Sequence, residues 1–319
     1  MLSRVADSLF WMSRYLERAE HTVRVVDVNI GLMLDRSSTS AERRWKRILV
    51  ALGNPGDIAW EGNYDRLIDK LIYDDSASAS VTSCIVSARE NARQARDEIS
   101  SEQWQQINKM YHYVTQTSTT DNTGKVAEFA VAVTDGLYLF QGVTDSTMTH
   151  GEGWHFIQVG RYIERATATA NILDVYQHEV FGTQKEYREG EQYLEWIGLL
   201  RCCTAFEAYC HIYTADLSQE RILEFLLLNQ KFPHSLRYSI DGLQQALQAI
   251  QNASGRHAVD ELNRVAGRLQ ASLSFVEVQE VLEQDTAAYL HNVLRQCRQV
   301  HDLIYRYYIH YSVEAALAM

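Results

Sequence analysis

A long apolar repeat at the start of the chain restricts its fold more than any other feature. Apolar residues recur there at alternating spacings of three and four. This spacing places them along one side of an α-helix of roughly eight turns or more, in the pattern of a heptad seam. Such a helix must bury its seam against other elements, so the repeat predicts a bundle of long helices. The seam residues are Leu2, Val5, Leu9, Met12, Leu16, Ala19, Val23, Val26, Ile30 and Met33.

Two further seams and a shortage of proline extend this prediction to the whole chain. The second seam runs from Ile85 to Ile99 through alanines, which allow a neighbouring helix to approach closely, and the third runs from Phe156 to Leu173. The chain contains only 2 prolines, and proline interrupts helices. No alternating run between turn signals indicates a strand. We therefore predict an all-α protein, with breaks between helices at 53–56, 117–124, 150–153, 182–190 and 252–257.

One charged motif occurs twice. The sequence Arg-Tyr-Leu-Glu-Arg-Ala at 14–19 is repeated, with Ile for Leu, at 161–166, an offset of 147 (161 minus 14). Two more blocks recur in the same order with slightly larger offsets, which is typical of a tandem duplication. These blocks begin at Trp45 and Leu71 in the first half, and at Trp196 and Leu226 in the second.

The duplication predicts the architecture. We expect a long-helix bundle built from two tandem pseudo-repeats, residues 1–146 and 147–319, packed about a pseudo-two-fold axis. One continuous domain is the alternative, since the sequence does not reveal whether the halves share a core.

The overall charge and the cysteines disfavour several classes of function. The formal net charge is -11 at pH 7, whereas a general nucleic-acid binder needs a surplus of Lys and Arg. Five irregularly spaced cysteines are typical of buried thiols in a reducing compartment. The first residues do not form a secretory signal, and no segment reaches the ~18 uncharged apolar residues of a membrane span. We expect a cytoplasmic protein that binds neither nucleic acid nor membrane.

The charged residues of the duplicated motif point away from the apolar seam. One interpretation is a solvated face with pairs inside each helix, Arg14 with Glu17 and Glu20 with Arg24. Exposed charges change at little energetic cost, however, and these persist in both copies. Their persistence favours a buried framework of ion pairs, because an unpaired buried charge is costly, or a ligand site. The repeated residues are Arg14, Tyr15, Glu17 and Arg18, with the counterparts Arg161, Tyr162, Glu164 and Arg165.

A second charged cluster lies in the first half. Its three arginines form a stripe on one helix face, and planar guanidinium groups suit carboxylate or phosphate recognition. The alternative is a self-neutralising ladder. The corresponding segment of the second half, from Leu243, lacks the charges, which favours a specialised site in the first half. The cluster comprises Arg89, Glu90, Asn91, Arg93, Arg96 and Asp97.

Metal and nucleotide motifs are weak or missing. Glu207 with His211, and Glu17 with His21, have a spacing that can hold a metal or share a proton, although such pairs are more often local hydrogen bonds. The Glu-x-x-His motif that starts at Glu152 stands alone, whereas di-iron bundles need two such motifs and further glutamates. The chain has no Walker loop, no G-x-G-x-x-G and no H-E-x-x-H. We predict no metal and no cofactor.

Four long motifs, at 2–20, 87–104, 153–166 and 225–237, resemble the bacterial alpha-E domain family, and the resemblance covers essentially the whole chain. The resemblance implies that genes of this family occur in clusters with the gene of a circularly permuted ATP-grasp amidoligase, and are sometimes fused to it. A transglutaminase-like peptidase and a proteasome-like peptidase can accompany them. The resemblance thus implies a system that makes or attaches a small peptide.

The resemblance also implies which positions carry the family's characteristic charges. This chain departs from the family at His155 and His234, where Arg is usual, and at Asn229, where Asp is usual. The matching positions are Arg14, Glu17, Arg18, Glu20, Arg89, Glu90, Asn91, Arg93, Asp97, Arg161, Glu164 and Arg165.

Our leading interpretation is an all-helical accessory or substrate-binding partner of the ATP-grasp amidoligase. Through the Arg/Glu-lined region it would bind the ligase, or a small peptide or carboxylate substrate. One alternative is an enzyme that acts on the same peptide or its acyl-phosphate, with Glu17 or Glu164 as acid/base and the arginines as an anion clamp. The other is a structural scaffold.

Overall fold

The computed structural model describes residues 1–319 except 35–40, 118–122, 182–190, 215, 255–259 and 310–319. Within the described residues every regular element is a helix, so the all-α prediction is confirmed. In the described ranges, short π-helical turns accompany the α-helices: η1 (Gln177–Phe181), η2 (Glu224–Leu228) and η4 (Tyr305–Ile309). The α-helices are α1 (Ser3–Leu34), α2 (Ala41–Ala51), α3 (Tyr64–Ile72), α4 (Val81–Gln94), α5 (Ser101–Gln116), α6 (Thr123–Thr147), α7 (Glu152–Tyr176), α8 (Glu191–Cys202), α9 (Phe206–Tyr213), α10 (Gln219–Leu223), α11 (Leu236–Ser254), α12 (Asp260–Ser274), α13 (Val278–Glu283) and α14 (Thr286–Ile304).

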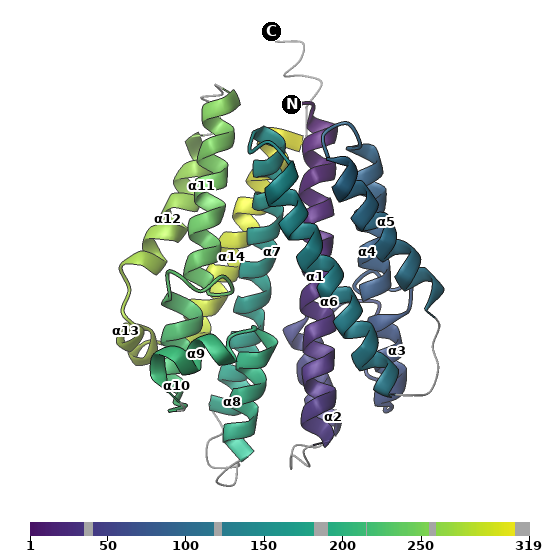
Figure 1. Ribbon diagram of the computed structural model, residues 1–319. Coiled ribbons are helices and arrows are strands. Elements are labelled where there is room, and N and C mark those ends of the chain that lie inside the picture. Colours follow the sequence, from purple (N-terminus) through teal and green to yellow (C-terminus); the bar gives the residue numbers. More distant parts are fainter. Residues whose placement is uncertain (35–40, 118–122, 182–190, 215, 255–259, 310–319) are drawn as a thin grey trace.

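Two long helices, α1 and α7, pack against each other in the middle of the molecule (Figure 1). On one flank α4 packs against α1, and α5 and α6 complete the layer. On the other flank α11 and α14 both pack against α7, and α12 packs against α11 and α14. The second helix of each half crosses to the other half, since α2 contacts α7 and α8 contacts α1. The pseudo-two-fold axis and the boundary at residue 146 stay predictions.

The apolar seams form a single core that extends through both halves. Leu9 and Val23 of α1, and Phe156 and Leu173 of α7, are all buried in it. The seam of α4 is buried as predicted, although that helix ends before the last predicted seam residue, Ile99. Because the core is continuous, separating the halves would expose apolar surface of both.

Polar caps explain several of the helix starts. Ser100 accepts a hydrogen bond from the backbone N–H of Gln103, whose side chain accepts one from the backbone of Ser100 in return. This capping box satisfies two of the N–H groups that a helix start leaves unpaired. Ser80 and Asp285 cap α4 and α14 in the same general way. These local signals place the helix boundaries without help from distant contacts.

Most predicted breaks agree with the helix boundaries. The break at 252–257 is partly wrong, because α11 continues to Ser254 and its last turns still pack on the core through residues such as Ile250. The break at 182–190 lies outside the described residues. Among the described helices, one segment of α6, Lys125–Thr147, is long and apolar enough to cross a membrane by length and composition, and 33% of it is buried.

Close approach of α1 and α7 requires a glycine. A Cβ atom at Gly160 would overlap the carbonyl oxygen of Phe10 and press on Ser13. Backbone atoms cannot rotate aside as a side chain does, so the overlap would force the two helices apart.

We therefore expect Gly160→Ala to lower the free energy of unfolding by about 1–3 kcal/mol, despite the better helix propensity of alanine. Urea denaturation followed by circular dichroism measures the change. Gly31→Ala is the matched control, since Gly31 is also helical but has no atom near its Cβ position. Equal effects of both substitutions would contradict this packing argument.

Candidate functional site

Two Glu–Arg pairs cross reciprocally between α1 and α7. Arg165 of α7 donates two hydrogen bonds to Glu17 of α1, one of them with an Nη2–Oε2 distance of 2.9 Å. In return, Arg18 of α1 donates to Glu164 of α7, with an Nε–Oε1 distance of 2.6 Å. Glu17 and Glu164 are 147 positions apart, and so are Arg18 and Arg165. Each residue of one pair therefore has its counterpart in the other.

Glu164 is held by a second arginine. The Nε of Arg14 donates to its other carboxylate oxygen at 2.6 Å. The Arg14 guanidinium also lies 4.7 Å from the ring centroid of Trp11, and its Nη1 is 3.1 Å from Nδ1 of His301. Burial and the neighbouring Arg14 lower the pKa of His301. One carboxylate therefore links two successive turns of α1 to α7.

The pairs are buried and shift the pKa values of their members. Side chains of Glu17 and Arg165 are only 5% and 3% exposed. Burial would raise the pKa of Glu164, but Arg14 and Arg18 together lower it to about 2. Burial raises the pKa of Glu17, and Arg165 opposes that shift. Burial alone would lower the pKa of Arg165, yet Glu17 raises it above the usual range.

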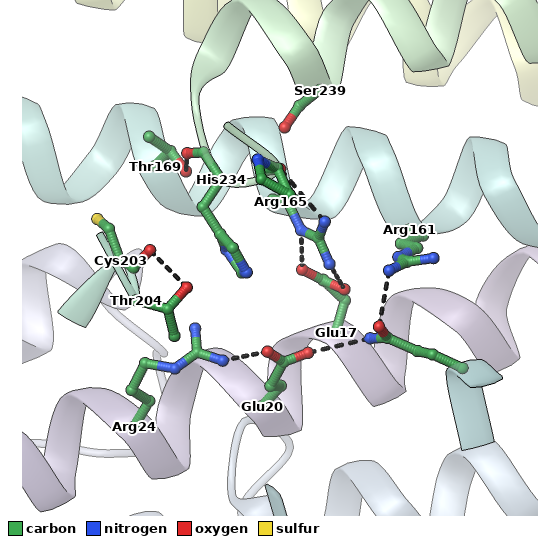
Figure 2. A network of polar contacts seen from close by, with 12 residues as sticks. Glu17, Glu20, Arg24, Arg161, Arg165, Thr169, Cys203, Thr204, His234 and Ser239 are labelled. Carbon is green, nitrogen blue, oxygen red and sulfur yellow. Dashed lines mark hydrogen bonds and ion pairs between the residues drawn. The ribbon is translucent and has the colours of Figure 1, made fainter. Parts of the chain in front are cut away.

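A polar chain continues from these pairs towards α6 (Figure 2). Glu20 accepts hydrogen bonds from Arg24, one turn further along α1, and from Nε2 of Gln141 on α6 at 3.2 Å. The Oε1 atom of Gln141 in turn accepts from Nη2 of Arg161 on α7 at 2.7 Å. Burial would raise the pKa of Glu20, and Arg24 lowers it. The chain thus connects three helices through four side chains.

Two histidines lie inside this network. Figure 2 shows the His234 ring pointing into the space between Arg165 and Arg24. The backbone oxygen of His234 accepts a hydrogen bond from Thr169 at 3.1 Å. Burial and, after it, the Arg165 charge lower the pKa of His234 well below its usual value. His21 is affected similarly: burial and Arg24 lower its pKa to about 4. Both rings are therefore neutral at physiological pH.

A second buried cluster was not predicted from the sequence. Arg44 and Arg47 of α2 both donate to Glu195 of α8, Arg44 with an Nη2–Oε1 distance of 2.8 Å. The Arg47 guanidinium lies 4.7 Å from the ring centroid of Tyr176 on α7. A signal was present, because Arg44 and Glu195 each directly precede a tryptophan in the repeated blocks.

The structure brings together most of the residues predicted from the duplicated motif. Arg14, Glu17, Arg18, Glu20, Arg161, Glu164 and Arg165 lie in one network. Arg14 and Glu17 do not form the expected pair inside α1, because each binds a residue of α7 instead. The expected pair between Glu20 and Arg24 does form, but it is buried rather than solvated. The arrangement is that of the predicted buried ion-pair framework.

The arginine stripe of the first half lies elsewhere. Arg89 donates to Asn108 at 2.8 Å and lies over the Tyr111 ring of α5. Arg93 pairs with Glu90 on the surface, as the self-neutralising ladder predicts. No contact found in the described residues joins this stripe to the α1–α7 network. Whether Arg89, Glu90, Asn91, Arg93 and Asp97 bind a ligand stays a prediction.

The space beside the network is very small. A cleft between α1, α6 and α7 is lined by Glu17, Gln141 and Arg161, among others. Its volume open to the centre of a water molecule is about 20 Å³, which accommodates about one water. The Nε of Arg161 is buried and has no hydrogen-bond partner among the described residues, so a water is a suitable occupant. A peptide does not fit.

The departures from the family pattern at Asn229 and His234 have simple structural settings. The Oδ1 atom of Asn229 accepts hydrogen bonds from the backbone N–H groups of Lys231 and Phe232, each at 2.9 Å. A carboxylate oxygen of Asp would accept the same bonds, so Asn retains this turn. His234 is already surrounded by arginines, and a neutral ring adds no further positive charge there.

Among the described residues, no third ligand converges on the Glu–His pairs that the sequence offered as weak candidates for metal binding. Within the described residues, one group of His, Cys, Asp or Glu side chains has converging ligand atoms, and it contains none of Glu17, Glu152 and Glu207. That group is Asp174, His178 and His291.

Comparisons with known proteins identify relatives of this chain. The family model Alpha-E, described as "A predicted alpha-helical domain with a conserved ER motif", matches residues 1–309. Uncharacterized proteins of Mycobacterium bovis and Mycobacterium tuberculosis are each 24% identical over 285 residues, which is 82% of this chain and 32% of each relative. The chain thus spans about a third of the length of the curated relatives it matches. No solved structure matches it significantly.

The reciprocal pairs lead to a prediction about stability. Glu17→Leu leaves Arg165 buried without its partner, so we expect a loss of about 3–5 kcal/mol in the free energy of unfolding. The double variant Glu17→Leu/Arg165→Met should lose about 2 kcal/mol less than the sum of the single variants. Urea denaturation of all four proteins measures this coupling. Glu90→Gln, which breaks an exposed pair, should leave stability unchanged; additive effects of the buried substitutions would contradict the argument.

The buried histidines lead to a prediction about pH. The folded-state pKa of His21 is about 4, below its unfolded value of about 6.5, so the unfolded chain binds its proton first. His21 therefore lowers stability progressively as the pH falls from about 6.5 towards 4. Glu164, with a pKa of about 2, acts only at lower pH.

Between pH 7.5 and 5, the His21→Gln variant should thus lose about 2 kcal/mol less stability than the unmodified protein. Urea denaturation at the two pH values provides the comparison. His112→Gln, at an exposed position on α5, is the control and should behave like the unmodified protein. The same loss in all three proteins would show that His21 does not carry the effect.

Proposed function

Because the chain belongs to the Alpha-E family, whose model matches residues 1–309, we propose that it is an all-helical accessory protein that docks on a circularly permuted ATP-grasp amidoligase. The ligase would form amide bonds in a peptide-synthesis or peptide-tagging system. The observation that carries the proposal is an exposed apolar surface on α5 and α6. The apolar and acidic side chains around this surface favour a protein as its binding partner.

The docking surface is a groove between α5 and α6. Leu139, which is 51% exposed, lines it, and Val131, which is 61% exposed, lies about two turns earlier on the same helix. The volume of the groove is about 280 Å³. Tyr113 and Met110 of α5 form the opposite side. Exposed apolar groups gathered in a groove are typical of protein-binding sites, and this one has room for one or two apolar side chains of a partner.

Acidic groups on the same side of α6 favour a protein over a lipid surface. Glu128 and Asp135 are exposed on α6 near Val131, and Asp135 lines the groove together with Lys109 of α5. Carboxylates repel anionic headgroups and nucleic-acid phosphates, whereas they complement Lys or Arg at the rim of a protein interface. The formal net charge of -11 acts in the same direction.

The length of the relatives supports a partner of this kind. The matched region is about a third of each mycobacterial relative, 32% of its length. Those polypeptides therefore carry this domain together with a much larger additional part. We propose that this domain acts together with a counterpart of that additional part, and the family resemblance points to the ligase.

A binding role is supported better than the enzymatic alternative. Glu164 is held ionised by two arginines, and both carboxylate oxygens of Glu17 accept from Arg165. A general acid or base needs reach to a substrate atom, and the adjacent cleft accommodates about one water. The network has the features of a framework that holds α1 and α7 in register.

The same framework supports the predicted duplication. The reciprocal pairs Glu17–Arg165 and Glu164–Arg18 are the contacts that a two-fold relation between α1 and α7 would produce. The crossed packing of α2 on α7 and α8 on α1 is consistent with it. We propose that residues 1–146 and 147–319 are two pseudo-repeats that form one domain.

The docking surface can be tested by binding. The purified protein should bind a circularly permuted ATP-grasp amidoligase from the same organism, as measured by calorimetry. Val131→Asp/Leu139→Asp should weaken binding at least about tenfold, equivalent to about 1.4 kcal/mol, because apolar groups at an interface would be replaced by charges. Ile212→Asp is the matched control, since Ile212 is similarly exposed but lies on α9.

Thermal denaturation of the variants confirms that each remains folded before binding is measured. Absence of binding between the unmodified proteins would overturn the partnership. Binding that the α6 variant and the Ile212 variant weaken equally would overturn the docking surface alone. Binding to anionic vesicles with a similar dependence on α6 would point to a membrane instead.

A further inference from the structure

Three potential metal ligands meet where the central helix α7 ends. Asp174 lies in the last turn of α7, and His178 lies four residues later in the π-helical turn η1. His291 comes from α14, which packs against η1. One ligand atom from each residue lies within 4.8 Å of the other two. This group was not visible in the sequence, because 117 positions separate His291 from Asp174.

The distances correspond to the shell of a small divalent ion. The Nε2 atoms of His291 and His178 lie 3.1 Å and 3.7 Å from the two carboxylate oxygens of Asp174. Zinc binds nitrogen and oxygen ligands at about 2.0–2.2 Å, so neighbouring ligands in a tetrahedral shell lie about 3.4 Å apart. The two observed separations are on either side of this value, and all three ligand atoms lie within 4.8 Å of one another.

One carboxylate oxygen of the group is buried and accepts no hydrogen bond from the described residues, and its nearest charged neighbour is His178 at 3.7 Å. The Asp174 side chain is only 16% exposed, against 58% for His178 and 60% for His291. The oxygen in question is its Oδ1 atom, and a buried carboxylate oxygen without a hydrogen bond is energetically costly. A cation bound between Asp174 and the two imidazoles would supply the missing interaction.

We propose that Asp174, His178 and His291 bind a divalent transition-metal ion of the zinc class, which joins α14 to the end of α7. The donor set selects this class, because imidazole nitrogen suits zinc, cobalt and nickel, whereas magnesium and calcium prefer all-oxygen shells. Asp174 is the anchor, held in place by burial. The exposed histidines rotate to complete the shell. Three protein ligands leave a fourth position for water or an anion.

One of the three ligands borders a groove that carries positive side chains. His291 also lines an open groove along α14, together with Arg295 and Arg298. Positive side chains of this kind attract carboxylate or phosphate groups. The site would therefore hold the metal in a setting where an anionic ligand can reach it.

Cobalt(II) is the most direct probe, since it occupies zinc sites and absorbs visible light when bound by nitrogen and oxygen ligands. The full chain, purified without a histidine tag and freed of metal with a chelator, is titrated with cobalt(II) chloride. We expect one equivalent to bind, and zinc chloride to displace it, while a large excess of magnesium chloride does not. We also expect the bound metal to raise the melting temperature.

Substitutions locate the site. His178→Gln and His291→Gln should each weaken cobalt binding at least about tenfold, as expected when a metal ligand or its support is removed. His211→Gln is the matched control and should bind like the unmodified protein; it removes an exposed histidine that is likewise four residues from an acidic residue, Glu207. Cys210→Ser excludes binding by the partly exposed thiol.

Absence of stoichiometric cobalt binding would overturn the proposal. So would affinity that neither His178→Gln nor His291→Gln changes. Equal loss in the His211 variant would show that surface histidines bind the ion nonspecifically. Melting curves recorded without metal establish that the variants are folded.

Discussion

The buried Glu–Arg pairs between α1 and α7 are the interaction on which the rest of the structure depends. Removing a carboxylate and a guanidinium from water costs several kcal/mol per ion, and only close pairing offsets that cost. Sliding either helix by one turn would separate Glu17 from Arg165 and Glu164 from Arg18 at the same time. The pairs therefore set the register of the central helices, and α4 and α11 pack against the helices so aligned.

This use of charge explains why recognition is better sought on the outside of the molecule. The arginines and glutamates of the duplicated motif bind one another, and Glu195 is held by Arg44 and Arg47 in a comparable way. Because these side chains bind one another, few of their donor and acceptor atoms remain to bind a substrate. The apolar groove on α5 and α6, by contrast, faces outward and has room for a partner's side chains.

The metal-ligand group and the ion-pair network illustrate different uses of the same long helix. Along the body of α7, Glu164 and Arg165 face α1 and are enclosed by it. At the end of α7, Asp174 and His178 face α14 near the surface, where ligands can exchange with solvent. The first arrangement favours rigidity. The second permits a cation to enter and bind.

The sequence by itself determined the helical class and the long apolar seams. It also indicated the positions where charged side chains contact protein or a ligand rather than water. These are local properties, because spacing along one helix decides which side chains share a face. The persistence of Arg14, Glu17 and Arg18 in a second copy also favoured a buried ion-pair framework or a ligand site over a solvated face. The predicted break at 252–257 was partly wrong, since the helical hydrogen bonding of α11 continues to Ser254.

Only the tertiary structure decided which charged residue binds which. The partners are 146 to 150 positions apart, and their meeting depends on the rotation and spacing of two helices, which Gly160 and the surrounding core determine together. The convergence of His291 with Asp174 and the open groove beside α6 depend on packing in the same way. Sequence periodicity describes one helix at a time, whereas a site made by several helices exists only once they are assembled.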